Sequence, residues 1–493
     1  MSGDSPATGV QFPIIDGSRS TTATGTRIFA RVARELSPGL AENIESEDDW
    51  RHNYIHHLRR ITEAELADPE ASSRVPEVAL RSLHEALVFV RAGRSVPLDD
   101  ATKRFDTHDF DRVTIEGTGD REEELAVPYE GRTLRGDKLR EQLSAWVESG
   151  ICEPSFATAI RRVVDHPEWL RLDDRRFVLL GAGAELGPLT PLARWGAHVT
   201  AVDIPSERVW QRIIAAARGG CGSLDLPARK GGDTGDPARA AGADLTTDMP
   251  EIAAWLSEYE GPLVVGNYVY ADGADNVRVS AAVDAIIDRL ARGNEMALAV
   301  LATPTDVYAV PKEAAEESRR RYEQRGRLAR TMATVSRGQL YAPNYRDDGD
   351  GGPLNVADAQ VPQQGPNYAL AKHLHRWRAR EARSQGMVSS VNVAPPTRTH
   401  SVTKNRLLAA AYRGAPRFDV EVFEPDTANS LMAAMLVHDL SYDGASSQPH
   451  ASLDHPLELL TEGANHGGLW RVPFAARSVL GLAAIGGLVR GGG

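Results

Sequence analysis

The stretch that decides the fold is residues 176–210, RFVLLGAGAELGPLTPLARWGAHVTAVDIPSERVW. An apolar run over 177–180 leads into a glycine turn and a helix pattern, and a second apolar run over 198–202 ends at Asp203. Glycines permit a tight turn and let a phosphate or a ribose approach the backbone at the start of the helix. An acid at the tip of the second strand suits the two hydroxyls of a ribose. The stretch therefore predicts the first half of a nucleotide-binding α/β unit.

Strand and helix patterns continue to alternate after this unit. Residues 242–256 contain a turn and then a helix, and an apolar strand follows within 261–270. An amphipathic helix over 277–293 leads into a strand over 296–306. Strands that alternate with helices indicate a parallel sheet covered by helices on both faces, with ligands at the carboxyl ends of the strands. The predicted fold class is α/β, with a doubly wound, Rossmann-like parallel sheet.

The rest of the chain is predicted to surround this core. Apolar residues at three- and four-residue steps predict helices between 27 and 93, one of them over 75–93, and two more over 135–150 and 153–170. A later insertion combines a charged helix with a Gly/Pro/Asp-rich loop, and we expect it to form a lid over a site or, alternatively, a dimer contact or a surface decoration. The predicted units are a loose arm over 1–26, a mostly helical N-terminal extension over 27–170, the core over 171–415 with the insertion over 310–365, and a C-terminal appendage over 416–493.

Composition excludes several classes of protein. The 493 residues carry a formal charge of −12, with 42% hydrophobic and 25% charged residues, which fits a globular protein and argues against a nucleic-acid partner. Two cysteines, Cys152 and Cys221, provide neither a disulfide framework nor a cysteine metal site. The N-terminus lacks a signal-peptide profile, and the apolar stretch over 478–489 is too short to span a membrane. We therefore expect a cytoplasmic protein without a membrane span.

His52 and His56 have the spacing of two metal ligands on one helix turn. No glutamate stands between them in a metalloprotease arrangement, and we interpret the pair as part of an exposed helix face. No metal site is predicted.

The second informative stretch is residues 366–405, where Tyr368 and Lys372 lie four positions apart on a helix pattern that runs into MVSSVNVAPPTRTHSVTKN. This order resembles the short-chain dehydrogenase/reductase family, in which a Tyr-x-x-x-Lys helix precedes a strand that reads Val-Asn, then small residues, Pro and Thr. The residues that match this strand end are Val391, Asn392, Pro395, Thr397 and Thr399.

The resemblance implies where a dinucleotide would bind. Gly183 and Gly187, in the turn that opens at Gly181, fall on the first two glycines of the family's Gly-x-x-x-Gly-x-Gly pattern, and Leu189 replaces the third. Asp203 lies where the family binds the adenosine ribose, and its charge would repel a 2′-phosphate. We therefore expect NAD as the cofactor, with NADP possible. The remaining cofactor-binding positions that the resemblance implies are Asp244 and Leu245 at the adenine, Asn267 after the fourth strand, and Lys372 at the nicotinamide ribose.

The resemblance also implies the chemistry. Tyr368 would be the acid in reduction and the base in oxidation, and the Lys372 ammonium would lower the tyrosine pKa from its ordinary value near 10. The family's substrate-binding serine lies about 13 positions before the tyrosine, where this chain has Asn355. We assign that role to Thr303 or Thr305, displaced by the insertion. The family's helix asparagine has no clear equivalent in this chain, and Asn276 is the candidate.

Three functions stay open. The first is an NAD(P)-dependent oxidoreductase that interconverts a carbonyl and an alcohol on a small or carrier-attached metabolite, working as a possible homo-oligomer. The second is an S-adenosylmethionine-dependent methyltransferase that uses the same glycine turn, although Leu179 and Leu180 stand where that family usually carries an acid. The third is a nucleotide-using enzyme or scaffold without net redox chemistry.

Overall fold

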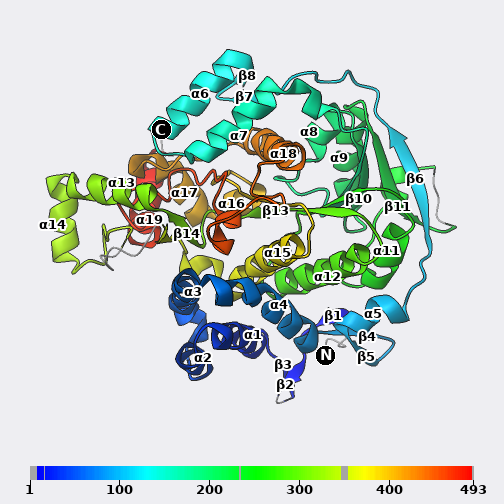
Figure 1. Cartoon of the computed structure of the whole chain (residues 1–493), viewed down its shortest axis with the longest axis horizontal. Helices are drawn as coiled ribbons and strands as arrows, with labels where there is room; N and C mark the ends of the chain where they lie inside the picture. The colour runs from blue at the N-terminus through cyan, green and yellow to red at the C-terminus, as the bar shows by residue number, and fades with distance from the viewer. Residues whose placement is uncertain (1–7, 16, 232–234, 346–353, 491–493) are drawn as a thin grey trace.

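The computed structural model describes residues 8–15, 17–231, 235–345 and 354–490. A seven-stranded sheet forms its centre, with six parallel strands and one antiparallel edge strand (Figure 1). The strand order is β16-β13-β12-β9-β10-β11-β6. Their bounds, in chain order, are β6 (Phe110–Glu116), β9 (Arg176–Leu180), β10 (His198–Val202), β11 (Ser223–Arg229), β12 (Leu263–Asn267), β13 (Met296–Ala302) and β16 (Ser389–Val393).

The prediction of an α/β fold on a mostly parallel sheet is confirmed. Numbered along the chain, the six parallel strands have the order 3-2-1-4-5-6, which is compatible with a Rossmann-like fold. All six lie within the predicted core over 171–415. The sequence prediction omitted β11 and β6, because the run SLDLPAR and the polar alternation of β6 give only weak strand patterns.

Alternate side chains of each central strand enter two different hydrophobic cores. In β9, Val178 and Leu180 belong to one core and Phe177 and Leu179 to the other, and all four are buried. This two-sided burial explains why the strands read as continuous apolar runs rather than alternating ones. Helices cover both faces. The first face is covered by α11 (Met249–Leu256), α12 (Ala274–Ala291) and α15 (Pro366–Ser384), and the second by α7 (Pro154–Asp165), α8 (Leu189–Arg194), α9 (Glu207–Arg218) and α18 (Pro425–Ser441).

The N-terminal segment packs beneath the first of these faces (Figure 1). Its helices are α1 (Thr21–Leu36), α2 (Pro38–Glu45), α3 (Trp50–Ala67), α4 (Pro69–Ala86) and α5 (Leu98–Arg104). The expectation of a loose arm over 1–26 is wrong for the described part of that range. Strand β1 (Gly9–Gln11) is buried, and the Val10 N–H donates to the Thr246 carbonyl oxygen at 2.9 Å.

The predicted helix over 75–93 is also wrong in its last part. Helix α4 ends at Ala86, and β4 (Val88–Arg91) pairs with β5 (Arg94–Pro97) in a hairpin. The turn between them places Ala92 and Gly93 at positive φ, which no helix allows. Val88, Phe89 and Val90 are β-branched or aromatic residues that favour a strand, although their spacing also fits a helix.

An antiparallel pair of strands frames the predicted insertion. Strand β14 (Val307–Pro311) pairs with β15 (Leu354–Asp358), and the chain between them forms α13 (Lys312–Glu323) and α14 (Arg327–Val335), at the left of Figure 1. The C-terminal apolar stretch forms α19 (Ala476–Arg490), which packs on α17 (Arg406–Gly414). Among the described residues, no helix is long and apolar enough to cross a membrane.

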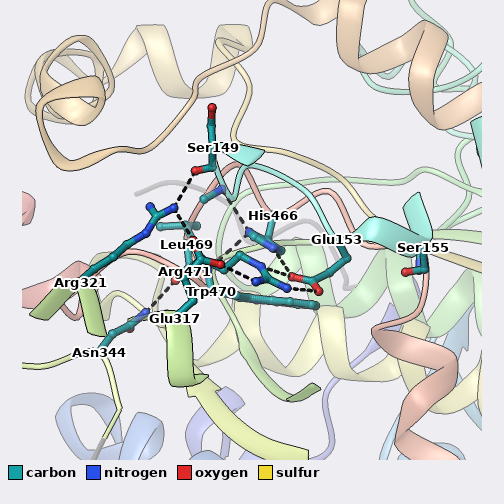
Figure 2. Close-up of polar contacts among 12 residues, drawn as sticks. Ser149, Glu153, Ser155, Glu317, Arg321, Asn344, His466, Leu469, Trp470 and Arg471 are labelled. Atoms are coloured by element: carbon teal, nitrogen blue, oxygen red, sulfur yellow. Dashed lines mark hydrogen bonds and ion pairs between the residues drawn. The ribbon is translucent and has the colours of Figure 1, made fainter. Parts of the chain in front are cut away.

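A buried ion cluster joins three distant segments of the chain (Figure 2). The Glu153 carboxylate, between α6 (Gly136–Glu148) and α7, accepts hydrogen bonds from His466 Nε2 at 2.9 Å and from Arg471 Nε and Nη2 at 2.9 and 2.7 Å. Arg471 Nη1 also donates to Glu317 Oε2 on α13 at 2.6 Å. Burial alone would raise the pKa of Glu153, but the bonds from His466 and Arg471 outweigh burial and lower it to about 2. The cluster therefore holds the N-terminal extension, the insertion and the C-terminal part together.

Candidate functional site

The four residues predicted to be catalytic line one small pocket. Thr303 and Thr305 follow the carboxyl end of β13, and Tyr368 and Lys372 lie on the first turns of α15. The pocket leaves about 10 Å³ for the centre of a water molecule, which is room for about one water. Its lining residues are Tyr54, Thr303, Thr305, Asp306, Gln360, Gln364, Tyr368, Ala369 and Lys372.

Helix α15 places Tyr368 and Lys372 one turn apart. Pro366 occupies its first turn, and Gly365 precedes it at a φ of +79°, a conformation that favours glycine. Both side chains are half-buried, and Lys372 Nζ lies 5.9 Å from the centroid of the Tyr368 ring. In the described part of the chain the ammonium forms no ion pair with a carboxylate.

A chain of hydrogen bonds leads to the Tyr368 hydroxyl. Gln364 Nε2 donates to Thr305 Oγ1 at 2.6 Å, and the two threonine Oγ1 atoms are 2.9 Å apart. The Thr303 side chain is hydrogen-bonded to Tyr368. Because the Gln364 amide already donates to Thr305, the Thr305 proton is free to point at Thr303, and the Thr303 proton at Tyr368. The chain therefore presents a donor to the phenol oxygen or to a ligand atom that takes its place.

Burial dominates the pKa values of the pair. It raises the pKa of Tyr368 above its ordinary value, against the opposing effect of the Thr303 hydrogen bond. It lowers the pKa of Lys372 to about 8, although the charge of Asp306 acts in the opposite direction. The prediction of a lowered tyrosine pKa is therefore wrong, because burial of the phenol outweighs the neighbouring donors. Tyr368 is protonated at neutral pH, and Lys372 titrates close to neutral pH.

Asp306 belongs to the pocket wall but is neutralised from behind. Its Oδ2 atom accepts a 2.8 Å hydrogen bond from Arg376 Nη1, and both residues are buried. Its Oδ1 atom accepts from the Val307 N–H at 2.8 Å. Since a buried carboxylate is stable only when paired, we assign Asp306 the role of fixing α15 against β14.

Sequence reasoning missed Tyr54, Asp306, Gln360 and Gln364. Tyr54 comes from α3 in the N-terminal extension, is 2% exposed, and is hydrogen-bonded to the backbone of Gly365. Burial raises its pKa to about 12. The two glutamines lie in the stretch QVPQQGP just before α15, and their position immediately upstream of the tyrosine was a usable signal. No local pattern links Tyr54 to residues 300 positions later.

Only the last part of the predicted lid contributes to this pocket, because Gln360 and Gln364 lie within the insertion over 310–365 and line it. Among its described lining residues none belongs to α13 or α14. The pocket is closed by residues that precede β14 and by the end of the insertion after β15. Helix α13 is fixed by the Glu317–Arg471 pair and by the hydrogen bond from Ser318 Oγ to the Val472 carbonyl oxygen, at 2.7 Å.

The glycine turn lies at the same edge of the sheet, after β9. Gly181 has a φ of +81°, and a Cβ on Gly183 would lie 2.9 Å from Val209 Cγ1, so both positions favour glycine. The Gly183 N–H donates to Asp203 Oδ2 at 2.7 Å, and the Ile204 N–H donates to Oδ1 at 2.8 Å. Burial raises the pKa of Asp203, and these two backbone donors oppose the rise. Asp203 therefore holds the turn itself and keeps lone pairs for further donors.

The predicted adenine-binding turn lies beside Asp203. The Ala243 N–H donates to the Asp203 carbonyl oxygen at 3.0 Å, which brings Asp244 and Leu245 next to the tip of β10. Asp244 Oδ1 is occupied by the N–H groups of its own turn, at Thr246 and Thr247, and Leu245 is buried. Both residues therefore lie beside the tip of β10, and the Asp244 carboxylate serves the local turn.

The loop after β12 connects the glycine turn to the pocket. Asn267 is buried and accepts from the Val269 N–H at 3.4 Å, which shapes the loop. The Tyr268 N–H donates to the Leu180 carbonyl oxygen at 2.9 Å, beside the glycine turn. The Tyr270 ring lies 6.4 Å from the Tyr368 ring, in an edge-on arrangement. All predicted site residues are therefore grouped along one edge of the sheet.

The remaining predicted positions are structural. Asn276 Oδ1 accepts from the Ala271 N–H at 3.1 Å and holds the start of α12. His52 is exposed and paired with Asp49 at 2.7 Å, and the described residues contain no group of three or more metal-ligating side chains.

Comparison with known proteins gave no relative: no family model, no curated protein and no solved structure matches the chain.

Proposed function

We propose that the chain is an NAD(P)-dependent oxidoreductase that interconverts a carbonyl and an alcohol on an organic metabolite. One observation carries the proposal. Thr303 and Tyr368 are 65 positions apart in the chain, yet the fold places both, with Lys372, around one pocket at the carboxyl end of β13. A hydroxyl, a phenol and an ammonium beside a Rossmann-like sheet are groups that can bind a carbonyl oxygen and protonate it during reduction. This is also the arrangement that the resemblance to the short-chain dehydrogenase/reductase family implies.

The residues at the glycine turn fit a dinucleotide at its adenosine end. Asp203 lies at the tip of β10 with lone pairs left for ribose hydroxyls, and Gly181 and Gly183 leave no room for a Cβ. The charge of Asp203 favours NAD over NADP, because a 2′-phosphate would meet a carboxylate. A bound nicotinamide supplies the hydride acceptor or donor for the reaction. Lys372 is the residue that would hold its ribose.

Tyr368 is the proton donor in this mechanism. Its raised pKa keeps it protonated at neutral pH, so it can give its proton to a carbonyl oxygen that becomes an alcohol. Thr303 donates to the same oxygen and keeps it in place, and Gln364 and Thr305 orient the Thr303 hydroxyl. A neutral phenol is a poor base, and we therefore assign reduction as the favoured direction near pH 7.

A titration tests the proposal directly. The purified chain is titrated with NADH, NADPH and S-adenosylmethionine, and tryptophan fluorescence reports binding. We expect NADH to bind more tightly than NADPH and S-adenosylmethionine not to bind. Binding of S-adenosylmethionine alone would overturn the oxidoreductase assignment.

One observation favours the methyltransferase as a second candidate. Glu185 lies inside the glycine turn, and its Oε2 atom accepts from the His400 N–H at 2.6 Å. A carboxylate in this turn repels a pyrophosphate, whereas it tolerates the positive sulfonium of S-adenosylmethionine. Glu185→Gln separates the two candidates. If the turn holds a pyrophosphate, the substitution should strengthen NADH binding. If the turn holds S-adenosylmethionine, NADH should bind neither the parent chain nor the variant.

A further inference from the structure

Gln360 presents an unused acceptor to the pocket. Its side chain lines the same small space as Tyr368 and Thr303, and the residue is only 3% exposed. Among the described residues its Oε1 atom has no hydrogen-bond partner. Buried polar atoms are almost always paired, and an unpaired one in a pocket marks the place where a ligand donates. The neighbouring Gln364, by contrast, uses its amide to hold Thr305.

The charges around the pocket decide which donor Gln360 takes. Lys372 brings an ammonium whose pKa is lowered to about 8 by burial, so a second cation in this space would be repelled. Asp306, the one carboxylate in the described pocket wall, is neutralised by Arg376 and offers a cation no counter-charge. A neutral hydroxyl is the donor that fits both conditions.

We infer that the substrate is an α-hydroxy ketone, or the matching vicinal diol, whose second hydroxyl donates to Gln360 Oε1. The inference rests on the proposed function, because Tyr368 must act on the reacting oxygen. Gln360 and Tyr368 line the same small space, and we therefore place the hydroxyl on the carbon next to the carbonyl. In the reduction the carbonyl carbon gains a hydride from the reduced nicotinamide, its oxygen gains the Tyr368 proton, and the neighbouring hydroxyl is unchanged.

Matched pairs of ketones test this inference. The probes are 3-hydroxybutan-2-one against butan-2-one, and 2-hydroxycyclohexanone against cyclohexanone, each with NADH and NADPH. Oxidation of the cofactor is followed by its absorbance at 340 nm, and ligand binding to the NADH-loaded chain by calorimetry. We expect the hydroxy ketone of each pair to have a kcat/KM about tenfold to a hundredfold higher, since its analogue leaves a buried acceptor unpaired.

Gln360→Leu is the diagnostic variant, and Gln363→Leu on the exposed side of the same segment is its control. Gln360→Leu should lower kcat/KM for the hydroxy ketone about tenfold or more, leave the plain ketone nearly unchanged, and keep the NADH dissociation constant. Gln363→Leu should change none of these. Equal kcat/KM for both members of each pair in the parent chain overturns the inference, as does an equal loss on both in Gln360→Leu. Absence of turnover together with absence of NADH and NADPH binding overturns the proposed function as well, and so the two failures are distinguishable.

Discussion

The Gln364 amide donates a 2.6 Å hydrogen bond to Thr305 Oγ1, although 59 residues separate the two positions in the chain. This bond occupies a lone pair of Thr305 Oγ1. The hydroxyl proton of Thr305 is left to point at Thr303 Oγ1, 2.9 Å away. The orientation of the hydroxyl beside Tyr368 is therefore set by a residue at the far end of the insertion.

Removal of each hydroxyl in turn should distinguish the roles of Thr303 and Thr305. We expect Thr303→Val to lower kcat for ketone reduction about a hundredfold, because in the proposed mechanism its hydroxyl donates to the reacting oxygen. Thr305→Val should lower kcat only about tenfold, since Thr305 acts through Thr303. Steady-state kinetics with NADH measure both effects. A larger loss in Thr305→Val than in Thr303→Val would contradict the order of the hydrogen bonds.

Tyr368→Phe should remove the proton donor and leave the fold intact. We expect kcat to fall by a factor of about 10³, while the NADH dissociation constant changes less than about threefold. Stopped-flow reduction and fluorescence titration give the two values. Tyr412→Phe, which changes a half-buried tyrosine outside the pocket wall, is the control and should retain turnover. Normal turnover in Tyr368→Phe would remove this residue from the mechanism.

Asp203→Asn should change the cofactor preference. The asparagine keeps one acceptor for the glycine turn and loses the charge that repels a 2′-phosphate. We expect NADH to bind about tenfold more weakly and NADPH to bind equally well or better, as measured by fluorescence titration. An unchanged ratio of the two dissociation constants would refute the assignment of Asp203 to the ribose.

His84 should make stability depend on pH in the alkaline range. It lies buried between Asp284 and Asp99, with Nε2 2.6 Å from Asp284 Oδ2. Burial alone would lower the pKa of His84, but the two carboxylates outweigh burial and raise it to about 9 from 6.5. Because the folded pKa is above the unfolded one, the stabilisation is complete below about pH 6.5 and is lost as the pH rises through 9. The shift corresponds to about 3 kcal/mol at most.

Urea unfolding of the parent chain and of His84→Gln, between pH 6 and 10, measures this effect. The free-energy difference between the two should shrink as the pH rises. His52→Gln, on the exposed surface, is the control and should show no such trend. A constant difference across the range would show that His84 is neutral in the folded chain.

Apolar runs predicted the central strands well, because a strand that is buried on both faces consists mostly of apolar residues. The runs of β9, β10, β12 and β13 were all identified, and the same pattern explains why alternate residues reach separate cores. Strand β4 was assigned to a helix, since four residues of Val-Phe-Val-Arg fit both periods. Only the turn at Ala92 and Gly93 decides between them.

The site was predictable only where its residues share a local pattern. The spacing of Tyr368 and Lys372 on one helix identifies them in the sequence. The two threonines are identifiable because they are polar residues directly after an apolar strand. Tyr54 and Gln360 join the pocket through tertiary packing, and such contacts leave no periodic signature. The pKa of Tyr368 could not be predicted either, because burial of the phenol depends on the whole pocket wall.

Strand β6 covers one edge of the central sheet. It pairs antiparallel with β11 along seven residues, from Ser223–Glu116 to Arg229–Phe110, and so occupies what would otherwise be the free edge of the parallel sheet. A free edge of this length is a template for pairing with other chains and for aggregation. The N-terminal extension therefore occupies this edge of the core, and we expect the core expressed without it to precipitate.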